Sequence, residues 1–286
     1  MAQSAYQVFR PARLQSAVVF ASPHSCRDYP PDLIRATQLD HHAIRSSEDA
    51  FVDRLFEPAT DFGAPLLLAG APRAYLDLNR SPDELDPALI EGARRHGHNP
   101  RVASGLGVIP RVVSNGRAIY SGKLTMTEAK ARIDRFWHPY HDALQGLLNE
   151  SHRAFGQAIL IDCHSMPHEA MDGMRRKNRK TPEIVLGDRF GAAAAGDVVD
   201  RVEAAFASAG LSVVRNTPFA GAYVTQAYGR PSRRQHAIQV EIDRALYMDE
   251  KRIAPRADFL AFRRVLRGVI AEIAAIGAAE MPLAAE

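Results

Sequence analysis

Short apolar runs alternate with longer segments of helical periodicity along this chain, and this alternation constrains the fold more than any other feature. Several runs are apolar throughout, as expected for strands that are covered on both faces. The alternation favours an α/β fold in which a mixed, mostly parallel sheet is flanked by helices. The predicted strands are Ala17–Ala21, Pro65–Ala69, Tyr75–Leu78, Ala158–Asp162, Ser212–Arg215, Ala222–Gln226 and His236–Ile242.

The helical segments leave no linker between two separate cores, so we expect residues 1–286 to form one domain. We expect Thr127 to cap the second helical segment and Pro139 to kink or split it. The stretch Ser81–Ser121 is rich in Gly, Pro, Arg and His, and is predicted to be a long functional excursion over the sheet. The predicted helices are Ser47–Phe56, Thr127–Phe155, Asp197–Ala209 and Ala257–Ala279.

Composition excludes several classes of protein. The formal net charge is only +3, which argues against an extended nucleic-acid surface. Two cysteines cannot build a disulfide framework, and the first residues lack the apolar core of a signal peptide. The most apolar late segment, "GVIAEIAAIGAAEM", is too short to span a bilayer. We therefore expect a cytoplasmic protein that binds neither nucleic acid nor membrane.

Two predicted strands end in the same dipeptide. "VVFASPHS" ends in His24-Ser25 and "AILIDCHS" ends in His164-Ser165. Ligands bind beyond the carboxyl ends of strands in open α/β sheets, so the two histidines could converge on a zinc ion. A third ligand could come from Glu48 or Asp49 in "RSSEDAFVDRLF". The alternatives are a hydrogen-bonded turn histidine and acidic residues that complement a helix dipole.

Two further polar residues lie in apolar surroundings. Glu241 is flanked by Val240 and Ile242 in "HAIQVEIDRALYMDE", where a carboxylate needs a partner or a function. Beside a metal-bound water it would be a natural general base, and on an edge strand it would simply face solvent. Arg80 in "YLDLNR" could bind a carboxylate through its planar fork, or could only cap a loop.

The cysteines and one basic run support rival interpretations. Cys26 follows His24 by two residues and could be the nucleophile of a cysteine amidohydrolase. Cys163 should face the core if His164 faces the site, because adjacent strand side chains point to opposite faces. The basic run "MRRKNRK", Met174–Lys180, could serve with Arg80 in a non-catalytic protein that binds anionic ligands, although a solvated loop is the simpler interpretation.

Taken in order, nine motifs resemble the N-formylglutamate amidohydrolase family. The resemblance extends from about Val18 to Glu250. The motifs are "SPHS" with "DYPP", "SEDAFVDRLF", "YLDLNR", "NPRVASGLGVIPR", "PYHDAL", "LIDCHSMP", "PEIVLGDRFG", "NTPFAGAYVTQAYGRP" and "HAIQVEIDRALYMDE".

This resemblance implies a single α/β domain like that of the zinc carboxypeptidases, a phosphorylase/hydrolase-like fold. It implies hydrolysis of N-formyl-L-glutamate to formate and L-glutamate in histidine breakdown, or of a related N-acyl amino acid, by a monomer or small homo-oligomer. One Zn²⁺ would be the cofactor and an N-acyl amino acid the small-molecule partner. The residues that the resemblance assigns are the zinc ligands His24, Asp49 and His164, the general base Glu241, and the substrate contacts Asn79, Arg80, Arg230 and His141.

Overall fold

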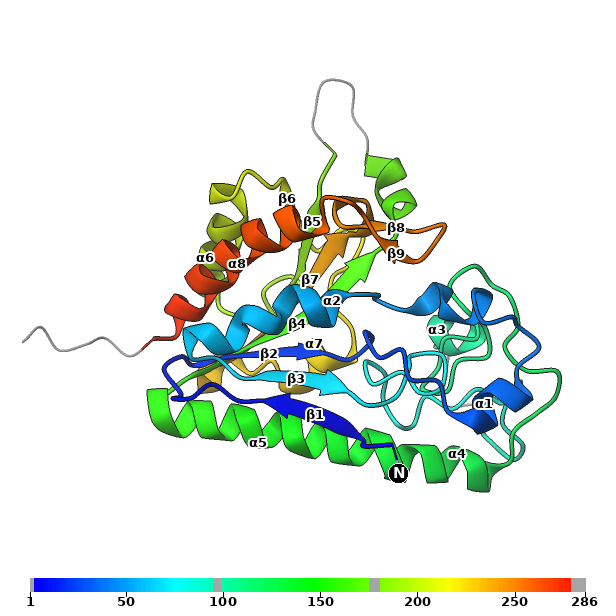
Figure 1. Cartoon of the computed structure of the whole chain (residues 1–286). Helices are drawn as coiled ribbons and strands as arrows, with labels where there is room; N and C mark the ends of the chain where they lie inside the picture. The colour runs from blue at the N-terminus through cyan, green and yellow to red at the C-terminus, as the bar shows by residue number, and fades with distance from the viewer. Residues whose placement is uncertain (1–2, 95–98, 175–180, 279–286) are drawn as a thin grey trace, which may run out of the picture.

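A seven-stranded mixed sheet forms the centre of the molecule (Figure 1), with the strand order β1-β3-β2-β4-β7-β5-β6. The computed structural model describes residues 3–94, 99–174 and 181–278. A separate two-stranded sheet pairs β8 with β9. The strands are β1 (Tyr6–Phe9), β2 (Val18–Ser22), β3 (Leu66–Ala69), β4 (Ala158–Met166), β5 (Ile184–Gly187), β6 (Val213–Arg215), β7 (Gln235–Asp243), β8 (Met248–Asp249) and β9 (Ala254–Pro255).

Strands β2, β3, β4 and β7 run parallel to one another. The outer strand β1 is antiparallel to β3, and β5 is antiparallel to β7 while β6 runs parallel to β5. The expected mixed, mostly parallel sheet is therefore confirmed. As a consequence, the carboxyl ends of four strands meet along one edge of the sheet, where ligands bind in open α/β folds.

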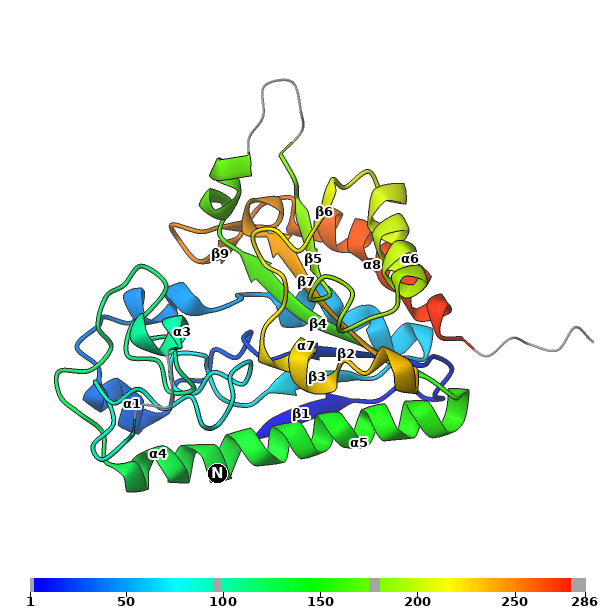
Figure 2. The ribbon, with the colours of Figure 1, turned by 180° about the vertical axis from the view of Figure 1, so that it is seen from behind.

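Alternate residues of each strand enter two different cores. In β2, Val18 and Phe20 pack with α2, α6 and α8, whereas Val19 and Ala21 pack with α4, α5 and α7. Figures 1 and 2 show α4 and α5 on one side of the sheet and α6 and α8 on the other. The helices are α1 (Pro31–Ala36), α2 (Val52–Phe56), α3 (Pro100–Ala103), α4 (Met126–Arg132), α5 (His138–Phe155), α6 (Gly196–Ser208), α7 (Tyr223–Tyr228) and α8 (Phe259–Ile276).

The short helical turns complete the described secondary structure. They are the 3₁₀ turns η1 (Ala43–Ser47), η2 (Glu57–Phe62), η4 (His168–Met174), η5 (Pro231–Arg233) and η6 (Arg244–Leu246), and the π-helical turn η3 (Ile133–Trp137). Within the described ranges, none of the helices combines the length and the apolar character that a membrane span needs.

The long helical segment begins two residues earlier than its sequence suggests. Thr125, not Thr127, is the N-cap, and it forms a capping box with Glu128. The segment is split as expected, by η3, which directly precedes α5 and Pro139. There the N–H of His138 donates to the carbonyl of Ile133, one residue farther back than in an α-helix. This wider turn lets the chain accommodate a proline that an α-helix interior would not tolerate.

Two predicted strands are wrong. Tyr75–Leu78 is a turn, because the N–H groups of Tyr75 and Leu76 both donate to the carbonyl of Pro72. Ala222–Gln226 contributes to helix α7, where the N–H of Gln226 donates to the carbonyl of Ala222. Both segments are short apolar runs, and periodicity over so few residues does not separate a strand from a helix or a turn.

The predicted helix Ser47–Phe56 is shorter than expected, because α2 begins only at Val52. Phe51, just before it, has a left-handed backbone with φ +68°. Glu48 and Asp49 therefore lie in the connection between η1 and α2 and not in the first turn of a helix. This position lets Asp49 approach the ends of β2 and β4, where its N–H donates to the carbonyl of His24 at 3.0 Å.

Most of the predicted excursion Ser81–Ser121 consists of turns and loops around the short helix α3. Figure 1 shows the loops around α1 and α3 gathered beyond the carboxyl end of β3. Asp86 holds this excursion together, since it accepts hydrogen bonds from Arg111 Nε and from the N–H of Ala88, each at 2.8 Å. The excursion contributes one wall of the cavity described next.

Candidate active site

Three side chains converge at the carboxyl edge of the sheet. His24 follows β2 by two residues, His164 lies near the end of β4, and Asp49 lies on the connection that crosses between them. One ligand atom from each residue lies within 4.8 Å of the others, and all three residues are buried. Asp49 Oδ2 is 2.9 Å from His164 Nδ1 and 3.4 Å from His24 Nδ1. The sequence named these three residues, and the structure brings them together.

The other nitrogen of each imidazole ring faces a second buried carboxylate. His24 Nε2 is 2.8 Å from Asp77 Oδ1, and His164 Nε2 is 3.0 Å from Asp162 Oδ2. An ionised carboxylate can only accept a hydrogen bond, so His24 Nε2 carries the proton and donates it to Asp77. His24 Nδ1 is left with a lone pair on the side of Asp49, whereas His164 Nδ1 forms a hydrogen bond with Asp49 Oδ2. Such carboxylate–histidine pairs are the usual support of metal-binding histidines.

One buried atom of this cluster lacks a hydrogen-bond partner. His24 Nδ1 is inaccessible to solvent and makes no hydrogen bond within the described part of the chain. A buried polar atom without a partner is costly, and a metal ion between His24, Asp49 and His164 would satisfy it. Two imidazole nitrogens and one carboxylate oxygen are the donor set of many catalytic zinc sites, in which a fourth position stays open. The residues present therefore fit a zinc ion.

Charge in the site is divided between two carboxylates. Burial alone would raise the pKa of Asp49, but its electrostatic interactions with the neighbouring His164 and His24 side chains hold that pKa well below its usual range. Glu241 has fewer compensating partners, and burial raises its pKa to about 7. The two groups thus differ in basicity as a metal ligand and a proton acceptor should differ.

Glu241 lies on β7 directly beside His164 of β4 in the sheet register. Strand β7 is central, between β4 and β5, so the alternative of a solvent-facing glutamate on an edge strand is wrong. Gln239 Nε2 donates a hydrogen bond of 2.8 Å to Glu241 Oε1. The Gln239 carbonyl oxygen in turn accepts from the N–H of Ala222 at 3.0 Å, which fixes the orientation of the amide.

The predicted Asn79-Arg80 pair also lies in the site, although the two side chains behave differently. Asn79 Oδ1 accepts from the N–H of Val224 at 2.8 Å, and its amide nitrogen donates to Asp162 at 3.3 Å. Asn79 is thus used within the protein. Arg80 Nη1 donates to the carbonyl of Asn79 at 2.7 Å, and Arg80 Nε donates to that of Leu106 at 3.0 Å. Neither bond neutralises the charge of Arg80.

A cavity of about 290 Å³ connects these groups. It is bounded by the sheet edge, by the excursion and by the loop that precedes α7. Its polar lining residues are His24, Ser47, Asp49, Arg73, Asn79, Arg80, Arg101, Ser114, His164, Ser165, Gln239, Glu241 and Arg244.

Sequence reasoning missed three arginines of this lining, Arg73, Arg101 and Arg244. Arg73 Nε donates to Asp77 Oδ2 at 3.0 Å, behind His24. Arg244 Nη2 donates to Asp49 Oδ1 at 3.1 Å and its Nε to Ser165 Oγ at 3.1 Å. Arg73 lies two residues before the quoted motif "YLDLNR", and Arg244 lies within "HAIQVEIDRALYMDE", but nothing local distinguishes these arginines from surface arginines.

The structure favours Asp49 over Glu48 as the acidic ligand. Glu48 is held by Arg45 through both carboxylate oxygens, at 2.9 and 3.0 Å, and by the hydroxyl of Tyr29 at 2.8 Å. Its carboxylate is therefore committed elsewhere, while Asp49 Oδ2 faces the two histidines.

With this geometry, the chain matches one family over most of its length. The family model described as N-formylglutamate amidohydrolase matches residues 16–248. The chain belongs to the N-formylglutamate amidohydrolase family. The resemblance read from the nine motifs is thereby confirmed, and the family name places the chain among enzymes that hydrolyse linear amides.

Relatives in the N-formylglutamate amidohydrolase family cover nearly the same length. An N-formylglutamate deformylase of Pseudomonas aeruginosa is 33% identical over 269 residues, which are 91% of this chain and 93% of the relative. An N-formylglutamate deformylase of Pseudomonas putida is 30% identical over 77% of each chain. The crystal structure of an N-formylglutamate amidohydrolase from Ralstonia eutropha has a TM-score of 0.88 and 33% identity, covering 95% of this chain and 98% of that one.

Two predicted substrate contacts of the amidohydrolase lie outside the cavity lining. His141 is buried, with Nδ1 2.8 Å from the Tyr228 hydroxyl and Nε2 3.0 Å from the Leu78 carbonyl, and burial lowers its pKa to about 4. Arg230 donates to the carbonyls of Gln226 and Gly229 instead of facing the site. Both side chains are used within the fold.

Cys26 is also absent from the cavity lining that the structure describes. It is half-buried and packs against the core that α4, α5 and α7 form with the sheet. Burial raises the pKa of its thiol to about 11. A thiol nucleophile needs a lowered pKa, so this environment does not favour the cysteine amidohydrolase. Cys163 is fully buried in the core on the other face of the sheet, with α2, α6 and α8, as expected. Residues 175–180 of the predicted basic run Met174–Lys180 lie outside the described residues.

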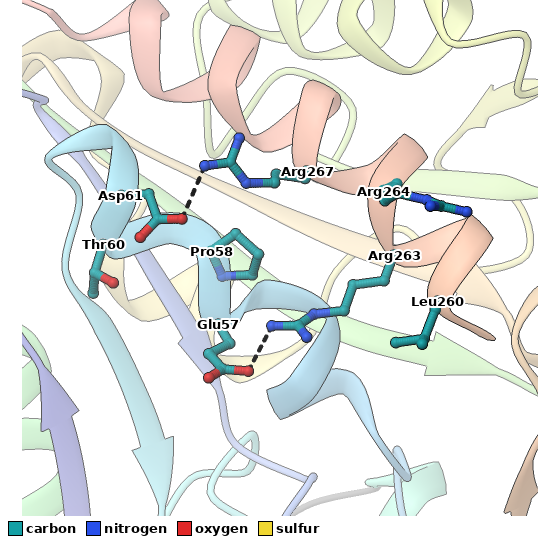
Figure 3. A pocket seen from close by; sticks show the side chains of 8 residues that line it. All are labelled: Glu57, Pro58, Thr60, Asp61, Leu260, Arg263, Arg264 and Arg267. Carbon is teal, nitrogen blue, oxygen red and sulfur yellow. Dashed lines mark hydrogen bonds and ion pairs between the residues drawn. The ribbon is translucent and has the colours of Figure 1, made fainter.

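A second, wider groove of about 460 Å³ lies between η2 and α8, away from the catalytic edge. Figure 3 shows Arg263 and Arg267 of α8 reaching Glu57 and Asp61 across it. These two ion pairs involve all the charged side chains that line the groove except Arg264, and the described lining includes no histidine or cysteine. It therefore offers no comparable catalytic chemistry.

Proposed function

We propose that this chain is a zinc-dependent amidohydrolase that converts N-formyl-L-glutamate and water to formate and L-glutamate, as in histidine breakdown. The observation that carries the proposal is the buried His24 Nδ1, which lacks a partner and faces Asp49 and His164 on the wall of a cavity that also holds Glu241. The names of the Pseudomonas relatives support the substrate.

His24, Asp49 and His164 would hold the ion through Nδ1, a carboxylate oxygen and Nδ1. When bound there, zinc supplies Lewis acidity, which makes water acidic near neutral pH and polarises a carbonyl oxygen. With the ion bound, Asp77 and Asp162 would keep the two rings in the tautomer that presents the Nδ1 lone pair to it. Arg244 occupies Asp49 Oδ1 and leaves Oδ2 for the ion.

Glu241 would accept a proton from the attacking water and later deliver it to the leaving amine of glutamate. A pKa of about 7 suits a group that must both take and give a proton near neutral pH. Gln239 fixes the position of the carboxylate through its 2.8 Å hydrogen bond. The Nη1 and Nη2 groups of Arg73 have no hydrogen-bond partner in the described structure, and they can stabilise negative charge that develops on the amide oxygen.

Arg80 would bind a carboxylate of the substrate. Arg80 is 6% exposed and lines the cavity, and it forms no ion pair within the described part of the chain. A buried cation without a partner favours an anionic ligand. Binding at Arg80 would fix the scissile amide relative to Glu241, and such positioning supplies part of the rate enhancement.

Replacement of Glu241 tests the proposal. Glu241→Gln should lower kcat for N-formyl-L-glutamate by about 10²–10⁴-fold, because it removes the proton acceptor, while one zinc per chain is retained. Zinc is measured on the purified protein, and chelation followed by zinc addition should abolish and then restore wild-type hydrolysis. Glu57→Gln, a change in the distant groove, is the matched control and should leave kcat unchanged.

Three results would contradict this assignment. Near-full activity of Glu241→Gln would exclude the proposed base. Hydrolysis that persists after chelation but is lost in Cys26→Ser would favour the thiol mechanism. No hydrolysis with or without zinc would favour a binding protein for anionic small molecules.

A further inference from the structure

Four arginines line the active-site cavity: Arg73, Arg80, Arg101 and Arg244. Two of them are neutralised inside the protein, since Arg73 pairs with Asp77 at 3.0 Å and Arg244 with Asp49 at 3.1 Å. Arg80 and Arg101 form no ion pair within the residues that the structure describes. The cavity therefore holds two cations that form no ion pair within the described residues.

These two cations are close enough to influence each other. Burial lowers the pKa of Arg80, Asp77 and Glu84 counteract this shift, and the positive charges of Arg73 and Arg101 add to it. The carboxylate of Glu84 forms no ion pair with either arginine in the described structure, and its oxygens accept hydrogen bonds from the N–H of Ser81 at 3.1 Å and from the amide of Asn99 at 3.2 Å. Like charges in one cavity repel, so an anion with two negative groups is the complementary ligand.

A single loop fixes the two arginines relative to each other. The N–H of Leu106 donates to the carbonyl of Arg101 at 2.8 Å, and the carbonyl of Leu106 accepts from Arg80 Nε at 3.0 Å. Helix α3, which carries Arg101, is capped by Asn99, whose side chain accepts from the N–H of Arg101 at 3.0 Å. The backbone of Arg101 is thus held although its side chain is exposed.

Arg80 and Arg101 lie at different depths in the cavity, as the binding of both carboxylates of one substrate would require. The α-carboxylate of an N-formyl amino acid is attached to the carbon that bears the scissile nitrogen, whereas a γ-carboxylate lies two methylene groups farther out. Arg80 is buried next to Asn79, whose amide is 3.2 Å from His164 Nε2. Arg101 is exposed and belongs to the excursion, at the outer part of the same cavity.

We propose that Arg101 forms a subsite for the side-chain carboxylate of the substrate, with Arg80 binding the α-carboxylate, and that Arg101 thereby sets the preference for N-formyl derivatives of acidic amino acids. This inference rests on the proposed deformylase function and adds a determinant of specificity to it. Arginine suits the role because its planar fork can form two parallel hydrogen bonds with a carboxylate.

The test compares N-formyl-L-glutamate with N-formyl-L-glutamine, which has nearly the same shape but a neutral side chain. The measured quantity is the ratio of kcat/KM for the two substrates, in the wild type and in Arg101→Met. We expect the ratio to fall by about 10–100-fold in the variant, the range of a charge-assisted hydrogen bond, mainly through a higher KM for N-formyl-L-glutamate. The kcat/KM for N-formyl-L-glutamine should change little.

Two further variants separate this role from simpler ones. Arg117→Met removes the same charge from an exposed site of the same excursion outside the cavity lining, and should leave the ratio unchanged. Arg101→Lys keeps the charge without the fork and should recover part of the ratio. Arg80→Met should lower kcat/KM for both substrates together, because both carry the α-carboxylate.

The outcomes are distinguishable. A wild-type ratio that survives in Arg101→Met, or an equal loss for both substrates, overturns the subsite while hydrolysis itself stands. A fall in the ratio in Arg117→Met as large as that in Arg101→Met also overturns it, since general electrostatic attraction would then explain the preference. If the wild type hydrolyses neither substrate with zinc present, the proposed function fails and the subsite fails with it.

Discussion

Replacing Asp77 by asparagine should weaken zinc binding although Asp77 does not itself face the ion. Its Oδ1 accepts from His24 Nε2 and from the N–H of Asn79, each at 2.8 Å, and its Oδ2 accepts from Arg73 Nε at 3.0 Å. Asparagine has one oxygen. If that oxygen faces His24, the new NH₂ group faces the donor of Arg73. If the NH₂ group faces His24, the ring must move its proton to Nδ1 and can no longer bind a metal there.

Loss of the partner behind a metal-binding histidine costs about 10–100-fold in metal affinity, or about 1.4–2.7 kcal/mol. We expect the upper part of this range for Asp77→Asn, because both orientations of the amide break one buried contact. Zinc affinity is measured at neutral pH by competition with a chromogenic chelator. Asp86→Asn is the matched control, since Asp86 is also buried and paired with an arginine, Arg111, at 2.8 Å, but lies outside the cavity lining.

An unchanged zinc affinity in Asp77→Asn would refute this reasoning about the tautomer of His24. Equal weakening in Asp77→Asn and Asp86→Asn would refute it as well, because the loss would then reflect general destabilisation. The expected pattern is a weakening confined to Asp77→Asn, with the zinc-free forms of both variants unfolding at similar temperatures.

Two other groups give predictions from their pKa values. With a thiol pKa of about 11, Cys26 should be about 10⁻³ thiolate at pH 8, so iodoacetamide should alkylate it more than a hundredfold more slowly than free cysteine. The alkylation rate should rise with pH up to about 11. Rapid labelling at pH 8, measured by mass spectrometry, would contradict the assigned burial. Burial lowers the pKa of His141 from 6.5 to about 4, so as the pH falls the unfolded chain takes up this proton before the folded chain does. The free energy of unfolding should therefore fall by about 3 kcal/mol between pH 6.5 and pH 4. His141→Gln should therefore show a smaller fall in the urea-unfolding free energy between pH 6.5 and pH 4, and an equal fall would contradict the prediction.

Local sequence patterns were sufficient to predict the strands and helices in which apolar residues recur over many positions. Strands β2, β4 and β7 and helices α6 and α8 match predicted segments, because an apolar run or an amphipathic stripe over many residues has few alternative structures. The sequence missed β1 and β5, which are four residues each. It mistook Tyr75–Leu78 and Ala222–Gln226 for strands, because tertiary contacts decide the structure of such short segments.

The candidate active-site residues were predictable for a related reason. His24, His164 and Glu241 are polar residues at or near the ends of apolar strands, where a polar side chain needs an explanation. Their motifs and that of Asp49 occur in the order of a known family. His141 and Arg230 occur in motifs of the same family and yet lie outside the cavity lining. A motif therefore indicated which segments build the site, but not which side chains of each segment face it.

The sequence by itself determined the fold class, the family and the side chains able to bind a metal, because these depend on composition and order along the chain. Only the tertiary structure decided which of two adjacent acidic residues faces the histidines, and which nitrogen of His24 is free to bind a metal. Arg45 and Tyr29 bind Glu48 and leave Asp49 for the histidines, and Asp77 behind His24 determines that Nδ1 is the free nitrogen. These choices depend on partners that come from distant segments, and the energy of a buried charge or proton is set by the groups that surround it in space.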